Sequence, residues 1–151
     1  MAATTVRMTL ESDVRLVDIV HSASETMAQL AGFDEDDGLN VGIAVREAVI
    51  NAMKHGNRMD RSKKVGVVLQ ATSNTVKARV KDQGAGFDPN ATADPTAGDN
   101  VLNTSGRGIM LIRAFVDRVD FKFREGRGME VTLVKKRAAR KPKTILASAR
   151  P

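Results

Sequence analysis

The chain has 151 residues, 42% of them hydrophobic and 28% charged, which is the composition of one ordinary globular domain with its own core. It has no cysteine, which excludes disulfides, thiolate chemistry and cysteine-based zinc sites, and no tryptophan or tyrosine, which disfavours base-stacking platforms for single-stranded nucleic acid. The sequence shows neither an apolar run of about 18 residues nor a signal-peptide pattern, so we expect a cytoplasmic protein that does not enter a membrane.

The formal net charge of +6 is unevenly distributed along the chain. Residues 135–151 hold seven basic residues and no acidic one, which leaves 17 basic against 18 acidic residues in 1–134. We therefore expect a near-neutral folded domain at 1–134 and a basic, disordered tail at 135–151. The alternative is that the tail binds a specific acidic partner.

Hydrophobic spacing predicts one strand and a first helix at the start of the chain. Residues 4–10 alternate weakly and predict an edge strand. A helix is expected over about 13–31, because apolar residues recur there at intervals of three and four. Its predicted inward face consists of Leu16, Val20, Ala23, Met27 and Leu30.

A second helix is predicted from the N-cap residue Asp34 to His55, with Gly56 as its stop. The hydrophobic period then changes from helical to two, which predicts a hairpin over about 65–80. The following segment, 88–105, has almost no apolar residues and predicts a long loop of the kind that is functional or disordered.

The last part of the chain repeats the pattern of a helix followed by a hairpin. A helix is expected over 109–117, and alternating residues predict strands at 119–123 and 129–133. The order of elements predicts the α+β class: a two-layer α/β sandwich whose mixed, mostly antiparallel sheet is covered on one face by helices.

Three polar side chains follow one stripe of the second predicted helix. Glu47, Asn51 and His55 lie at positions i, i+4 and i+8. A solvated polar face is the alternative, but the segment 41–53 is rich in Val, Ile and Ala and should be largely buried. Buried polar groups need hydrogen-bond partners. A ligand could be that partner, in a site that binds a metal ion or transfers a proton.

Two glycine-rich turns stand elsewhere in the sequence. The first, 82–86, reads Asp-Gln-Gly-Ala-Gly after a predicted strand, and the second, 106–108, reads Gly-Arg-Gly before a predicted helix. Glycines allow a ligand to approach the backbone, and free N–H groups at a helix N-terminus favour phosphate. A tight turn with a capping Asp and a plain loop-to-helix junction are the respective alternatives.

Combined, these pieces fit ATP. The carboxylate of Asp82 can accept a hydrogen bond from an exocyclic amine, and Arg107 can donate to phosphates. The carbonyl of Asn51 can bind Mg²⁺, which needs few protein ligands. Glu47, one turn earlier, can take a proton from an attacking hydroxyl group or water.

The motifs that carry these residues resemble a known family. Glu-x-x-x-Asn-Ala-x-x-His-Gly-Asn at 47–57, Asp-x-Gly-x-Gly-Phe-Asp at 82–88 and Gly-Arg-Gly-Ile-x-Leu-Ile at 106–112 are similar to the N, G1 and G2 boxes of the GHKL (Bergerat, histidine-kinase-like) ATP-binding fold. Within that fold they are most similar to the anti-sigma-factor serine/threonine kinases of bacterial partner-switching systems. The resemblance covers roughly residues 5–135.

The resemblance implies a role for each matching position. Asn51 would be the Mg²⁺ ligand, Glu47 the general base and Asp82 the group that binds the adenine amino group. The loop 88–105 would form a lid over the nucleotide. Further contacts to ATP are expected from the two glycine-rich turns, and a contact to adenine from the last strand, at Gly84, Gly86, Gly106, Arg107, Gly108 and Thr132.

The family phosphorylates a serine or threonine on a small anti-anti-sigma (STAS-type) antagonist and, as a homodimer, sequesters a sigma factor. The alternative for this chain is a regulatory module that binds ATP and sequesters a protein without phosphotransfer. Two other readings are weaker. A phosphoacceptor role for His21 lacks the following acidic residue, and binding of nucleic acid through the tail has little other support.

Overall fold

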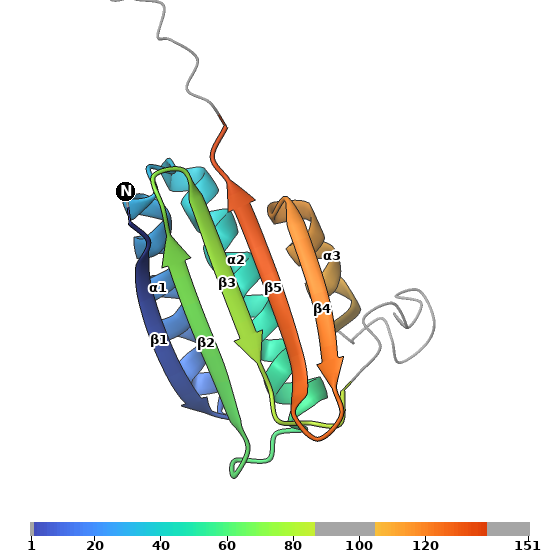
Figure 1. Cartoon of the computed structure of the whole chain (residues 1–151). Coiled ribbons are helices and arrows are strands. Elements are labelled where there is room, and N and C mark those ends of the chain that lie inside the picture. The colour runs from blue at the N-terminus through green and yellow to red at the C-terminus, as the bar shows by residue number, and fades with distance from the viewer. Residues whose placement is uncertain (1, 87–104, 139–151) are drawn as a thin grey trace, which may run out of the picture.

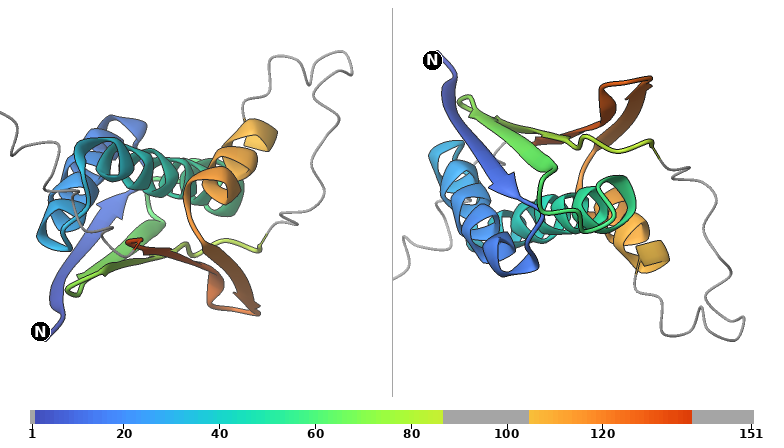
Figure 2. Two further views of the ribbon diagram at one scale, coloured as in Figure 1. Left: turned by 90° about the horizontal axis from the view of Figure 1, so that it is seen from above. Right: turned by 90° about the horizontal axis from the view of Figure 1, so that it is seen from below.

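The computed structural model describes residues 2–86 and 105–138 (Figure 1). Three α-helices cover one face of a five-stranded sheet and leave the other face open (Figure 2). Every neighbouring pair of strands is antiparallel, which confirms the predicted α+β sandwich. Across the sheet the strands are β1 (Thr4–Glu11), β2 (Lys64–Ala71), β3 (Thr75–Lys81), β5 (Gly128–Lys136) and β4 (Arg118–Arg124).

Helix α1 (Val17–Leu30) follows a 3₁₀ turn at Val14–Leu16, which Asp13 caps. Its inward face differs from the predicted one, because Leu30 is 54% exposed. The residues packed against the core at that end of the helix are the small Ala28 and Ala31, which hydrophobic spacing does not single out.

Helix α2 (Glu35–Asn51) lies between α1 and α3 (Ser105–Phe115) behind the sheet (Figure 2). Its start is capped as predicted, since Oδ1 of Asp34 accepts a hydrogen bond from the N–H of Asp37 at 2.8 Å. Small buried residues allow its neighbours to approach closely: Gly38, Gly42, Ala44 and Ala48. The chain then passes through a π-type turn, Ala52–Gly56, instead of continuing as regular α-helix.

The sheet follows the predicted alternation. On β2 and β3, Val65, Val67, Leu69, Val76, Ala78 and Val80 are all buried beneath the helices. Neighbouring residues on each strand point to the opposite, open face.

The start of the predicted tail belongs to the fold. Strand β5 runs to Lys136, two residues past the expected boundary, and the N–H of Arg137 donates to the carbonyl of Asn74 at 2.6 Å. The rest of the predicted tail, from residue 139, and the loop 87–104 lie outside the described residues. Within the described ranges, no helix is long and apolar enough to cross a membrane.

Candidate functional site

The last turn of α2 carries two of the predicted polar residues. Asn51 is buried, at 3% exposure, and its side chain forms no hydrogen bond with another described residue. Glu47 lies one turn earlier and is half-buried. A buried amide needs a hydrogen-bond partner, so this position suits a ligand that binds the amide.

The first turn of α3 closes against these two side chains. A Cβ atom added to Gly108 would lie 2.8 Å from Oε2 of Glu47 and 3.6 Å from Oδ1 of Asn51. Only glycine therefore permits this approach without moving the carboxylate. The structure thus brings the second glycine-rich turn, which begins a helix, to the polar end of α2, where backbone N–H groups favour an anion.

Burial changes the ionisation of the polar groups at this end of α2. Desolvation raises the pKa of Glu47 above its ordinary value, and the nearby charges of Arg46 and Lys54 oppose this only in part. Burial, followed by the charge of Lys54, lowers the pKa of His55. Glu47 is therefore a stronger proton acceptor than an exposed glutamate, while His55 favours its neutral form.

Asp82 is fixed at the end of β3. It is 1% exposed, and its Oδ1 accepts hydrogen bonds from the N–H groups of Gly84 at 2.9 Å and Met129 at 3.0 Å. Within the described part of the chain, Oδ2 has no hydrogen bond of its own. The carboxylate is thus held rigidly by one oxygen, and the other remains available to a donor.

Three glycines pack directly around Asp82. A Cβ atom on Gly56 would overlap the Asp82 carboxylate, one on Gly84 would overlap the carbonyl of Gly56, and one on Gly128 would overlap the carbonyl of Asp82. The end of the π-type turn, the 82–86 turn and the start of β5 therefore meet at backbone distance. The sequence-based prediction placed Gly84 in the site, gave Gly56 only the role of a helix stop, and did not include Gly128.

Gly86, also predicted to contact the nucleotide, has a left-handed backbone with φ of +88°. A Cβ atom there would lie 2.6 Å from the ring of Phe123 on β4. Both observations require glycine at this position. Gly86 is the last residue described before the gap in the structure.

Asn57 is a positioning residue that the sequence-based prediction left without a role. It is 1% exposed, and its Nδ2 donates to Oγ of Ser12 at 2.9 Å and to the carbonyl of Lys64 at 3.0 Å. Its Oδ1 accepts from the N–H of Gln83 at 2.7 Å. Asn57 therefore links the end of β1, the start of β2 and the Asp82 turn.

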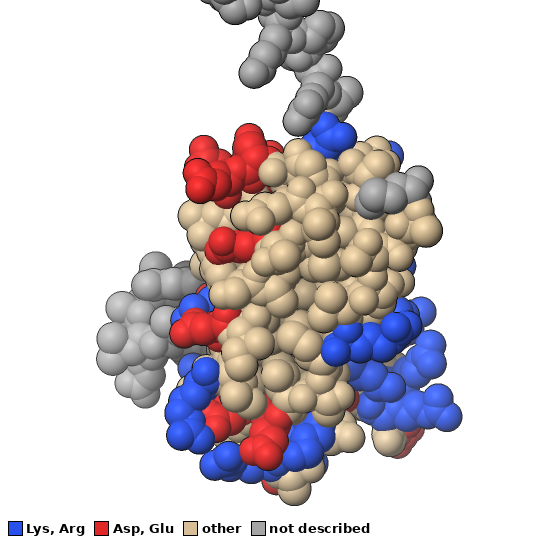
Figure 3. Space-filling view, turned by 90° about the vertical axis from the view of Figure 1, so that its left-hand side faces the viewer, with Lys and Arg blue, Asp and Glu red and all other residues tan. Residues whose placement is uncertain are grey.

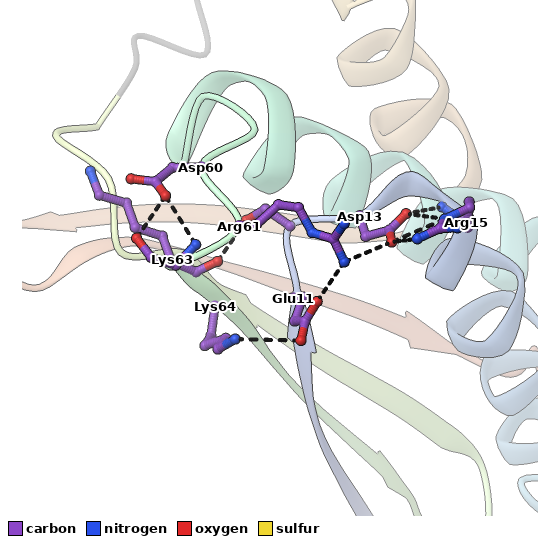
Figure 4. A network of polar contacts seen from close by, with 9 residues as sticks. Glu11, Asp13, Arg15, Asp60, Arg61, Lys63 and Lys64 are labelled. Carbon is purple, nitrogen blue, oxygen red and sulfur yellow. Dashed lines mark hydrogen bonds and ion pairs between the residues drawn. The ribbon is translucent and has the colours of Figure 1, made fainter.

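Surface ion pairs add to this link (Figure 4). Arg61 lies 2.9 Å from Oε2 of Glu11 and 3.5 Å from Oδ2 of Asp13. Hydrogen bonds from Arg15 lower the pKa of Asp13 to about 2. These pairs are exposed, so each contributes little to stability. We therefore assign the positioning of the Asp82 turn to Asn57.

Thr132 does not lie with the other candidate residues. On β5 the buried residues are Met129, Val131 and Leu133, so Thr132 points to the open face, opposite Arg79 of β3. Asp82 lies on the helix side. We therefore leave Thr132 out of the site, and the backbone N–H of Met129 is the contribution of β5 to this corner.

The phosphate-binding prediction is only partly described by the structure. Gly106 and Arg107 fall in the first turn of α3, but the side chain of Arg107 is not described, and neither are residues 88–104 of the predicted lid over 88–105. The described residues include no cluster of three or more His, Cys, Asp or Glu side chains that could hold a metal. A cation here would therefore depend on Asn51 and on oxygens supplied by a ligand.

Comparison with known proteins places this fold and site in a class. Residues 9–135 match the model of the histidine kinase-like ATPase domain, and the chain belongs to this family. The chain is 28% identical to the serine-protein kinase RsbW of Halalkalibacterium halodurans over 137 residues, which cover 87% of this chain and 82% of that protein. It is also 28% identical to the anti-sigma F factor of Clostridium perfringens over 104 residues, covering 64% and 71%.

A solved structure agrees with the fold. The crystal structure of the RsbU and RsbW domains of a Mycobacterium tuberculosis protein matches with a TM-score of 0.62 and 21% identity. The match covers 91% of this chain and 33% of that longer one.

Proposed function

We propose that this chain is an ATP-dependent serine/threonine protein kinase that phosphorylates an antagonist protein and also sequesters a sigma factor. The observation that carries the proposal is the close packing of Gly108 against Glu47 and Asn51, which gathers a carboxylate, a buried amide and a helix N-terminus. The family match over 9–135 and the names of the relatives support it.

Asn51 would hold Mg²⁺, and Asp82 would hold adenine. The side chain of Asn51 is buried and has no hydrogen bond to another described residue, and the same is true of Oδ2 of the rigid Asp82 carboxylate, so both fit such a ligand. The Mg²⁺–ATP complex supplies the phosphoryl group and partly neutralises its charge. The N-terminal turn of α3, with Arg107, would bind the phosphates.

Glu47 would act as the general base. Its carboxylate takes the proton of the substrate hydroxyl as the hydroxyl oxygen bonds to the γ-phosphorus and the bond to the ADP oxygen breaks. Burial raises the pKa of Glu47, which strengthens its carboxylate as a proton acceptor.

The test is phosphotransfer by the Glu47→Ala variant. We expect it to bind ATP with wild-type affinity but to lose transfer by about 10²-fold or more, the usual contribution of a positioned base. Transfer of labelled γ-phosphate to a purified antagonist measures the rate, and nucleotide titration measures binding. Transfer at the wild-type rate would remove Glu47 from the proposed mechanism.

A second function shares the same site. In it, the chain binds ATP and sequesters a protein without meaningful transfer. The half-buried Glu47 favours the kinase. Burying a carboxylate is costly, and a protein that only binds ATP needs no general base. Wild-type protein that binds ATP and its partner but transfers no phosphate would favour this second function.

A further inference from the structure

The open face of the sheet is strongly basic. The side chains that point to it alternate with the buried ones on all five strands, and nine are basic against three acidic. The basic ones are Arg7, Lys64, Lys77, Arg79, Lys81, Arg118, Lys122, Arg124 and Lys136; the acidic ones are Glu11, Asp120 and Glu130. This excess of six equals the formal net charge of the entire chain.

The charge is separated between the two sides of the molecule. Figure 3 views the protein from the β1 side, with the open face of the sheet to the right and the helices to the left. Lys and Arg gather at the lower right and Asp and Glu at the upper left, while both kinds mix along the lower left edge. In the helix layer, the first turn of α2 carries three acids, Glu35, Asp36 and Asp37.

Most of these cations have no ion-pair partner. Among the described residues, only Lys64 and Arg118 on this face lie within 4.0 Å of a carboxylate oxygen, 3.9 Å from Glu11 and 2.7 Å from Asp120 respectively. Arg79 is half-buried on the central strand β3, and its Nε is buried without a hydrogen-bond partner. A buried N–H of a guanidinium without a partner is costly, and arginines are frequent anchors of interfaces.

Two hollows on this face provide places for anchoring groups. One, of about 510 Å³, is lined by Arg79 with other residues of β3, β4 and β5, among them Lys77, Arg118, Lys122, Glu130 and Thr132. The other, of about 520 Å³, lies over Gly66, where an added Cβ would meet nothing within 4 Å, and its lining includes Lys64, Lys81 and Arg127. A carboxylate entering either hollow would meet several cations.

We propose that the open face of the sheet is a docking surface for an acidic protein partner, whose carboxylates pair with Arg79 and its basic neighbours. A second copy of this chain fits poorly, because two such faces would oppose like charges. Nucleic acid also fits poorly. Among the described strands, the residues that alternate onto this face include no aromatic side chain that could stack a base.

This inference stands apart from the kinase assignment, because the basic side chains that carry it are not residues of the candidate nucleotide site, and Thr132 has been left out of that site. Asp82 of the nucleotide site borders only the second hollow. Its test uses the full chain and a short peptide that alternates glutamate and valine, with a glutamine-for-glutamate peptide as the uncharged control. We expect amide NMR signals of β3, β5 and β4 to shift with the acidic peptide alone. The shifts should vanish at about 1 M salt.

Arg79→Glu should weaken binding of the acidic peptide by at least about tenfold. Lys77→Glu, at an exposed position, is a second variant in case the first fails to fold. Lys63→Glu is the matched control. It changes the net charge by the same amount, but Lys63 lies in the loop before β2, outside the face. Equal losses in the face and control variants, shifts elsewhere on the chain, or tighter binding of a DNA duplex at this face would each overturn the proposal.

Discussion

Glu47 shows how one residue combines a functional requirement with a cost to stability. It stands on a largely apolar helix, and its spacing from Asn51 was enough to predict both as site residues. Burial raises its pKa, so the folded chain holds the proton more tightly than the unfolded chain does. The ionised carboxylate therefore opposes folding at neutral pH.

This predicts that Glu47→Gln is more stable than wild type at about pH 7. The pKa of Glu47 is higher in the folded chain than in the unfolded chain. The loss of wild-type stability is therefore absent at pH values well below the ordinary pKa of 4.5, and it grows as the pH rises from there through the raised pKa. The difference in denaturation midpoint should accordingly shrink toward pH 4. A variant less stable than wild type at about pH 7 would contradict the assigned effect of burial.

Thr132 shows where prediction at the residue scale was weak. The position came from family resemblance, while the alternation of Met129, Val131 and Leu133 already placed it on the other face. Because side chains on a strand alternate with a period of two, a displacement of one residue moves a side chain to the opposite face.

At the scale of elements, the site is held where three chain segments cross. The π-type turn after α2, the turn after β3 and the start of β5 meet around Asp82, and glycines make the approach possible. Asn57 fixes the π-type turn to the strands. Hydrophobic spacing predicted the helices and hairpins, but the strand order β1-β2-β3-β5-β4 and these backbone contacts depend on long-range packing that spacing does not encode.

We predict that Asn57→Ala destabilises the fold by about 2–3 kcal/mol, because three hydrogen bonds are lost and buried groups of Ser12, Lys64 and Gln83 lose their partner. Denaturant unfolding measures the change. Asn74→Ala, in the exposed turn between β2 and β3, is the control and should change stability much less. A loss below about 0.5 kcal/mol for Asn57→Ala would show that these bonds do not brace the site.

At the scale of the molecule, one layer carries the candidate chemistry and the other a basic surface. The helices and the inner face of the sheet hold Glu47, Asn51 and Asp82, while the open face holds nine of the basic residues that the structure describes. Figures 1 and 3 show the two layers from different sides. The sequence pointed to the tail as the source of basic charge. The structure adds the sheet face, because residues far apart in the chain gather there only when β3, β4 and β5 pair.

The central claim is that the end of α2 and the first turn of α3 bind Mg²⁺–ATP. Calorimetric titration of the full chain with ATP, in the presence and absence of Mg²⁺, tests it for wild type and Asn51→Ala, with thermal melting to confirm that both are folded. We predict that Mg²⁺ tightens ATP binding to wild type and that Asn51→Ala loses at least about tenfold of this gain, which is about 1.4 kcal/mol. Wild type that does not bind ATP, or an Asn51→Ala variant that keeps the full effect of Mg²⁺, would contradict the claim.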